Sequence, residues 1–146
     1  RYMNKFLKVD TEKSLKEISK NIIFHEWEGH SYSSILTSCD FAIIPIDLKS
    51  KMASGKPENK LINIWKMGLP VITSSTDSYK RVMNDCNLDL FCENKNEWVD
   101  KFKMLSDDSD LRKSLAKKAY NYAIENYGQD AVVRRWDAMF NFFFKW

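Results

Sequence analysis

Glycine, proline, cysteine and histidine are scarce in this 146-residue chain, with 4, 3, 3 and 2 copies. With so few glycines, the chain contains no G-x-G-x-x-G run of the kind that forms a dinucleotide-binding turn. The three cysteines are an odd number without metal-type spacing, which favours buried reduced thiols in a cytosolic protein over a redox role. His25 and His30 have no acidic partner or nucleophile at a recognisable spacing, so a catalytic role is the weaker interpretation for both.

The chain also lacks a strong charge bias and a long apolar run. Its net charge is only +3, and its basic residues form no stripe interleaved with aromatics, so we expect no nucleic-acid partner. No apolar run is long enough to span a bilayer, and no signal peptide is recognisable. With 44% hydrophobic and 29% charged residues, the composition is that of a soluble globular protein of one domain. The chain begins at Arg1 rather than at Met, so we expect a fragment or an excised domain.

The most informative stretch runs from residue 54 to residue 73 and predicts a loop, a helix, a turn and a buried strand. Pro57 suits the first helical position, and Glu58 places a negative charge in the first turn. Gly68 suits the left-handed position just after a helix, and Pro70 prevents the helix from resuming before the strand at 71–72. Apolar residues recur at helical spacing and predict one buried helix face: Leu61, Ile64 and Trp65.

Helices and strands alternate along the rest of the chain, which predicts an α/β fold with a doubly wound parallel sheet. The other expected strands are 21–24, 41–46 and, more weakly, 88–92; the long apolar run at 41–46 indicates helices on both sheet faces. Other helices are expected from Asp10 or Thr11 to Lys20, from Ser31 or Ser33 through Cys39, after Asp77, from Asn96 through Leu105, from Asp107 or Ser109 to Asn126, and from Asp130 onward.

Lysines gather ahead of the central helix. Lys49, Lys51 and Lys56 lie in an expected flexible loop that leads to a helix N-terminus, where free N–H groups and the helix dipole attract anions. Ligands of open α/β sheets bind beyond the carboxyl ends of the strands. We expect four segments to converge there: the 25–30 loop, the 46–57 loop, the start of the central helix, and the 74–77 turn. The alternative is that these lysines form a solvated helix end.

The order of these weak motifs resembles the donor-site region of GT-B-fold glycosyltransferases of the group-1, family-4 type. The resemblance rests on Cys39-Asp40-Phe41-Ala42-Ile43-Ile44-Pro45, on Lys56 and Lys60, and on Gly68-Leu69-Pro70-Val71-Ile72. It extends more weakly through Tyr127 and covers roughly three quarters of the chain. It implies that residues 1–146 form one Rossmann-like donor-binding domain, an incomplete GT-B C-terminal domain without the family's first strand and helix. The last helix, at 130–146, would then pack on a missing N-terminal domain.

The resemblance also implies a binding site for a nucleotide sugar that needs neither a metal nor a cofactor. Lys56 and Lys60 would bind the diphosphate, and Trp27 would stack on the base or, alternatively, cap the sheet edge. Asn63 stands where the family has its ribose-binding Glu, so it retains hydrogen bonding but loses the strength of a charged acceptor. Glu58 would compensate for that lost carboxylate or merely oppose the helix dipole. The remaining expected contacts are Asn59, Ser74, Ser75 and Thr76.

Two classes of function follow. The first is a hexosyltransferase of polysaccharide biosynthesis, cytoplasmic or peripherally membrane-associated, that transfers sugar to a glycan or lipid-linked acceptor. The isolated chain would be inactive, because half of the catalytic cleft is absent. The second is a non-catalytic Rossmann-like binding or interaction module, which the missing phosphate-binding glycines and Asn63 favour. The aromatic residues of the last helix have three interpretations: core, contact with the N-terminal domain, or contact with a membrane surface.

Overall fold

The computed structural model describes residues 13, 16–17, 19–25 and 28–144. Contacts divide the chain into two units, residues 1–32 and 33–146. In the first unit, Lys13, Lys16 and Glu17 have helical backbone, within the helix predicted to end at Lys20. The strand predicted at 21–24 is wrong: these residues have irregular backbone, and Ile23 is 78% exposed. An apolar run becomes a strand only where a neighbouring strand pairs with it, and none of the described residues does so here.

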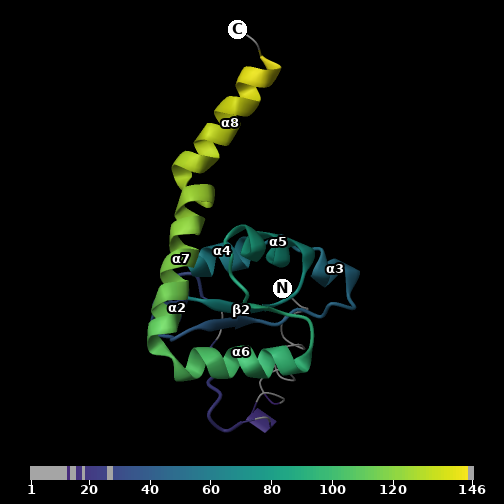
Figure 1. Cartoon of the computed structure of the whole chain (residues 1–146), viewed down its shortest axis with the longest axis vertical. Coiled ribbons are helices and arrows are strands. Elements are labelled where there is room, and N and C mark those ends of the chain that lie inside the picture. The colour runs from purple at the N-terminus through teal and green to yellow at the C-terminus, as the bar shows by residue number, and fades with distance from the viewer. Residues whose placement is uncertain (1–12, 14–15, 18, 26–27, 145–146) are drawn as a thin grey trace. The chain divides into compact units, whose positions relative to one another are not determined.

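From Tyr32 onward, helices alternate with strands (Figure 1). The elements are α2 (Tyr32–Thr37), β1 (Ala42–Ile44), α3 (Lys51–Ser54), α4 (Asn59–Trp65), β2 (Val71–Ser74), α5 (Asp77–Asp85), β3 (Phe91–Cys92), α6 (Lys95–Asp107), α7 (Ser109–Tyr127) and α8 (Gln129–Phe143). Within the described residues, the three strands form a parallel sheet in the order β1-β2-β3, with Ile43 beside Ile72 and Ser74 beside Cys92. The expected α/β class with a parallel sheet flanked by helices is therefore confirmed, and it is compatible with a Rossmann-like arrangement.

Helices cover the central strand of this sheet on both faces. Figure 1 shows α4 and α5 on one face and α6 on the other, while α7 crosses one end of the layers. All four residues of β2 are buried as a result. Coverage is incomplete at the edge strand β1, where Ile43 is 51% exposed, so the prediction of two covered faces along 41–46 is wrong there. An apolar run alone does not distinguish a central strand from an edge strand.

The central helix and the turn after it follow the predicted pattern closely. α4 buries Leu61, Ile64 and Trp65, as its spacing predicts, and the Trp65 ring meets Tyr122 of α7 edge-on at 6.0 Å. Gly68 has a φ of +78°, the left-handed conformation predicted for it. The expected start at Pro57 is wrong by two residues, because the chain is still bonded back to α3 through Gly55 and Lys56. α4 begins at Asn59, and the Ile62 N–H donates to the carbonyl of the N-cap Glu58.

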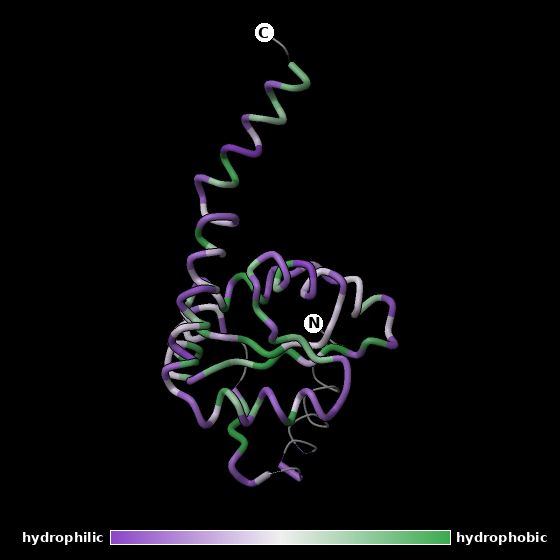
Figure 2. Tube along the Cα trace, viewed as in Figure 1, coloured by the Kyte–Doolittle hydropathy of each residue, from purple (hydrophilic) through white to green (hydrophobic). Residues whose placement is uncertain are grey.

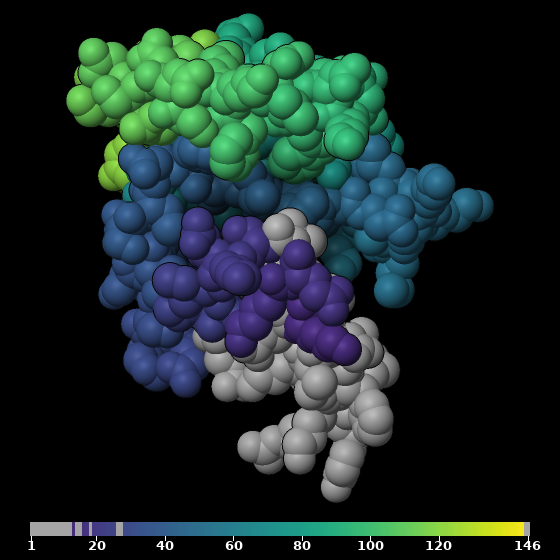
Figure 3. Space-filling view, turned by 90° about the horizontal axis from the view of Figure 1, so that it is seen from below, coloured from purple at the N-terminus to yellow at the C-terminus, as the bar shows by residue number. Residues whose placement is uncertain are grey.

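Side-chain capping decides where the other helices begin. Asn94, rather than the predicted Asn96, caps α6 by accepting hydrogen bonds from the N–H groups of Asn96 and Glu97. The 46–57 segment, predicted as a loop, contains α3, whose N-cap Ser50 accepts a hydrogen bond from the Ala53 N–H. α3 projects from the surface in the space-filling view (Figure 3).

The predicted burial of the thiols is confirmed for two of the three cysteines. Cys86 and Cys92 are buried, and burial raises the pKa of the Cys92 thiol to about 11, so that it stays protonated and unreactive at neutral pH. The prediction is wrong for Cys39, which is exposed and lies two residues after the end of α2. Among the described residues, no helix is both long and apolar enough to cross a membrane.

The aromatic residues of α8 do not belong to the core. Phe142 and Phe143 are 72% and 69% exposed, so the core interpretation of the last helix is wrong. Ala131 is the buried residue that α8 contributes within its described length, at the end where the helix meets α7. Figure 2 shows hydrophobic and hydrophilic residues alternating along α8 as it leaves the sheet.

Candidate functional site

Two loops meet at the carboxyl ends of the strands. The hydroxyl of Ser74, the last residue of β2, accepts a hydrogen bond from the Ile46 N–H at 2.7 Å and donates one to the Ile46 carbonyl at 2.9 Å. The hydroxyl of Ser78 in α5 donates to the Lys56 carbonyl at 2.8 Å. These bonds tie the segment after β1, which leads to α4, to the segment after β2, which leads to α5. The 46–57 loop, the start of α4 and the 74–77 turn therefore lie together at one sheet edge.

Two of the residues predicted to contact the ligand already form hydrogen bonds within the protein at this sheet edge. Ser74 is 5% exposed, and its hydroxyl makes the two bonds to Ile46. Thr76 is 3% exposed, and its hydroxyl caps α5 by accepting from the Tyr79 N–H at 3.3 Å. A ligand could reach these hydroxyls only by displacing the bonds that position the loops. Both residues therefore shape the edge instead of presenting free polar groups at its surface.

Glu58 is also engaged, in a cluster that connects three helices. Its carboxylate oxygen Oε1 accepts from Arg81 Nη2 at 2.7 Å and from the Tyr127 hydroxyl at 2.9 Å, and the side chain is 13% exposed. Burial alone would raise the pKa of Glu58, but a backbone hydrogen bond, Arg81 and Tyr127 together lower it below its usual value. Lys66, just after α4, donates to the Tyr127 carbonyl at 2.6 Å. The Glu58 carboxylate is thus already paired and is not a lone charge at the helix dipole.

Four predicted site residues remain available on the surface of α4 and just before it: Lys56, Asn59, Lys60 and Asn63. All four are exposed, and no side-chain hydrogen bond or ion pair holds any of them within the described ranges. Asn59, Lys60 and Asn63 lie on the helix side opposite the buried residues, because 3.6 residues complete one turn. Ser75 is half-buried, and its N–H donates to the Cys92 carbonyl at 3.0 Å. Trp27 lies outside the described residues.

Sequence reasoning did not identify Arg81, Ser78 or Tyr127 as part of this edge. Arg81 and Tyr127 lie 23 and 69 residues from their partner Glu58, and Ser78 lies 22 residues from its partner Lys56. Helical periodicity predicts only which way a side chain points from its own helix. It carries no information about which distant residue lies opposite, so no local signal could have revealed these contacts.

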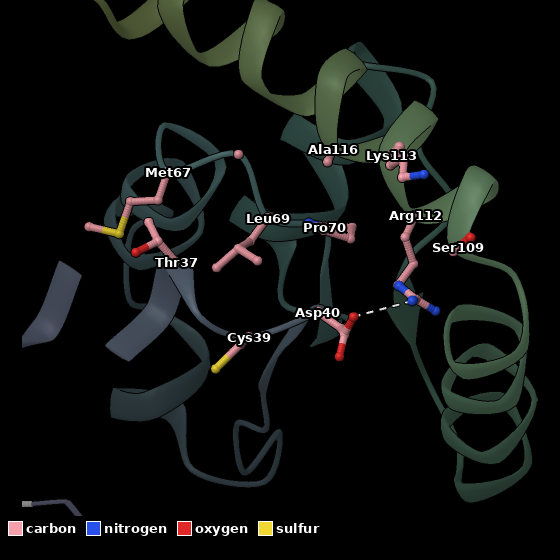
Figure 4. Close-up of a pocket in the computed structure, with 11 residues that line it drawn as sticks. Thr37, Cys39, Asp40, Met67, Leu69, Pro70, Ser109, Arg112, Lys113 and Ala116 are labelled. Atoms are coloured by element: carbon pink, nitrogen blue, oxygen red, sulfur yellow. Dashed lines mark hydrogen bonds and ion pairs between the residues drawn. The ribbon is translucent and has the colours of Figure 1, made fainter. Parts of the chain in front are cut away.

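A hollow of about 250 Å³ lies at the opposite edge of the sheet, near the amino ends of β1 and β2 (Figure 4). Arg112 crosses it to reach the Asp40 carboxylate at 3.2 Å and also donates to the carbonyls of Leu105 and Ser106 at the end of α6. The Arg112 guanidinium therefore connects the end of α6 to Asp40, which precedes β1. Ligands in open parallel sheets bind at the carboxyl edge, so we assign the hollow a structural role.

Comparisons of the chain with protein-family models, with curated proteins and with solved structures found no match. The chemistry of the carboxyl edge is therefore the best indication of function. Lys56 and Lys60 supply positive charge there, and Asn59 and Asn63 supply donors and acceptors of hydrogen bonds. Among the described residues, no three His, Cys, Asp or Glu side chains form a group that could hold a metal ion. The exposed set is suited to binding an anion that also carries hydroxyl groups.

Proposed function

We propose that this chain is the donor-binding domain of a GT-B-fold glycosyltransferase and that it binds the diphosphate of a nucleotide sugar at the start of α4. The observation that supports this most is the hydrogen bonding of Ser74 to Ile46 and of Ser78 to the Lys56 carbonyl, which ties the backbone of the exposed Lys56 to the sheet edge. Lys60 follows on the first turn of α4. Fixed cations at this position would stabilise the charge that accumulates on a leaving diphosphate, without a metal ion.

The contacts in the structure refine the roles within this proposal. Lys56 and Lys60 bind the diphosphate, while Asn59 and Asn63 hydrogen-bond to the sugar or ribose hydroxyls. Glu58, with its carboxylate held by Arg81 and Tyr127, acts as a positioning residue for the start of α4. The transfer itself also needs an N-terminal GT-B domain, which would bring the glycan or lipid-linked acceptor at the cytoplasmic side of a membrane. We expect the chain on its own to bind donor without transferring sugar, since reacting groups must be held within bonding reach.

Titration with UDP, GDP and ADP, followed by NMR, tests the proposed site. Amide shifts are expected at Lys56, in residues 58–60 and at Ser75, and the matching nucleosides should cause much smaller ones. Replacing Lys60 with Ala should weaken diphosphate binding about 10- to 160-fold, because a charged hydrogen bond contributes about 1.5–3 kcal/mol. Lys117→Ala, which removes an exposed lysine of α7, is the matched control and should leave binding unchanged. Shifts confined to other regions, or equal losses for diphosphates and nucleosides, would contradict the assignment.

The second candidate function is a non-catalytic binding or interaction module of Rossmann-like fold. One observation favours it: the side chains of Glu58, Ser74 and Thr76 hold the fold together and are not free for a ligand. Nucleotide titration distinguishes the two candidate functions. The donor-binding domain shows diphosphate binding that depends on Lys60, whereas the non-catalytic module shows no nucleotide-dependent shifts at α4.

A further inference from the structure

One side of α8 carries an apolar surface, here called the α8 stripe. Its members, given with their exposed fractions, are Val132 (42%), Val133 (49%), Trp136 (54%), Met139 (38%), Phe140 (49%), Phe143 (69%) and Phe144 (55%). With 3.6 residues per turn, these positions fall on one side of the helix, and Ala131, which is buried where α8 meets α7, falls on the other. Trp136 stacks on Phe140 at 5.9 Å between ring centroids, and Phe140 lies 6.0 Å from Phe144, so the rings form a continuous surface.

The α8 stripe is large enough to form a stable interface. From the exposed fractions, its side chains present about 700 Å² of apolar surface, given that a large aromatic side chain can bury about 150–250 Å². The largest apolar patch of a typical monomer covers about 300–600 Å². A standard protein interface buries about 800 Å² on each partner, so the α8 stripe has nearly the area that one partner contributes.

The spacing and sizes of the side chains match a second copy of the same helix. Val133 and Phe140 occupy a positions of a heptad, and Trp136 and Phe143 occupy d positions. In an antiparallel pair, Val133 of one copy lies opposite Phe143 of the other, and Trp136 lies opposite Phe140. Each end layer then combines a small side chain with a large one. A parallel pair would place Trp136 against Trp136 and Phe143 against Phe143, which overpacks those layers and leaves the Val133 layer underfilled.

We propose that two copies of this chain associate through an antiparallel pairing of their α8 stripes. Because α8 leads away from the sheet (Figure 1), this pairing places the two sheets at opposite ends of the helix pair, where they do not collide. The charges favour this partner over a membrane surface. Between residues 129 and 143, α8 has two basic residues, Arg134 and Arg135, and two acidic ones, Asp130 and Asp137, whereas membrane-surface helices carry a predominantly basic polar face. The association does not depend on the proposed nucleotide binding.

Sedimentation equilibrium of the 146-residue chain tests the association. The expected mass is twice the 17.2 kDa of one copy. Phe140→Glu, in the middle of the α8 stripe, should weaken the dimer at least 100-fold and yield monomer. Ala138→Glu is the matched control, because Ala138 is exposed and lies on the side of α8 opposite the α8 stripe, and it should leave the dimer intact. A monomeric unmodified chain at high concentration, or equal effects of the two variants, would overturn the proposal.

Disulfide cross-linking tests the orientation independently of those variants. In a Cys39→Ser background, the double variant Val133→Cys/Phe143→Cys should form a covalent dimer on oxidation, whereas Val133→Cys alone should not. Cross-linking of Val133→Cys alone would indicate a parallel pair and overturn the proposed orientation. Flotation with vesicles of phosphatidylserine and phosphatidylcholine tests whether the α8 stripe binds a membrane surface instead. If the chain is monomeric and binds these vesicles in a manner that Phe140→Glu abolishes, the α8 stripe is a membrane surface and the dimer is refuted.

Discussion

Replacement of Glu58 with Gln removes the negative charge at the centre of the cluster that joins α4, α5 and the end of α7. Its carboxylate accepts two hydrogen bonds, from Arg81 Nη2 at 2.7 Å and from the Tyr127 hydroxyl at 2.9 Å. A hydrogen bond to a charged group contributes about 1.5–3 kcal/mol when it is shielded from water. Glu58 is well shielded at 13% exposure, but Arg81 is 56% exposed, so solvent weakens that half of the cluster. We therefore expect the substitution to lower the free energy of unfolding by about 2 kcal/mol.

Urea and thermal unfolding of the whole chain measure this loss. A decrease of about 2 kcal/mol corresponds to a lower melting temperature by roughly 8 °C for a domain of this size. Glu93→Gln is the matched control, because Glu93 pairs with Lys80 at 2.6 Å but both side chains are largely exposed, at 52% and 41%. It should cost much less than Glu58→Gln, because water screens an exposed ion pair. The reasoning would be refuted if Glu58→Gln destabilised the chain no more than Glu93→Gln.

Two further predictions concern acid stability and the turn after α4. The folded-state pKa of Glu58 lies below its ordinary value of 4.5, so its stabilising contribution is complete above pH 4.5 and is lost as the pH falls through the lowered pKa. Urea unfolding between pH 6 and pH 3 should therefore show that the free energy of unfolding falls less with acid in Glu58→Gln than in the unmodified chain. The same dependence on pH in both proteins would contradict this. Gly68→Ala should lower the free energy of unfolding by about 1–2 kcal/mol because of the φ of +78° alone, since nothing lies within 4 Å of the added Cβ. Gly68→Asn should lower it less, because Asn tolerates left-handed backbone. Equal losses of the two variants in urea unfolding would indicate a clash instead.

Local chemistry is sufficient to predict the central part of this fold. The 3.6-residue spacing of apolar side chains indicates the buried face of α4, because burial of one helix side requires that spacing in any globular protein. Gly68 is predictable because few other residues adopt its backbone conformation without strain. The alternation of helices and strands similarly predicts a parallel sheet, since parallel strands need a crossover between them. These features depend on residues that are close together in the sequence.

Other features were decided by partners far away in the chain. The run at 21–24 is apolar enough for a strand, but it lacks a strand to pair with among the described residues, and so its pattern misled the prediction. The lysines and asparagines near α4 could be named from the sequence, but the engagement of Glu58 by Arg81 and Tyr127 could not. The composition of α8 likewise does not reveal whether its aromatic rings are buried. Periodicity specifies the direction of a side chain, whereas only the packing of distant elements determines what that side chain meets.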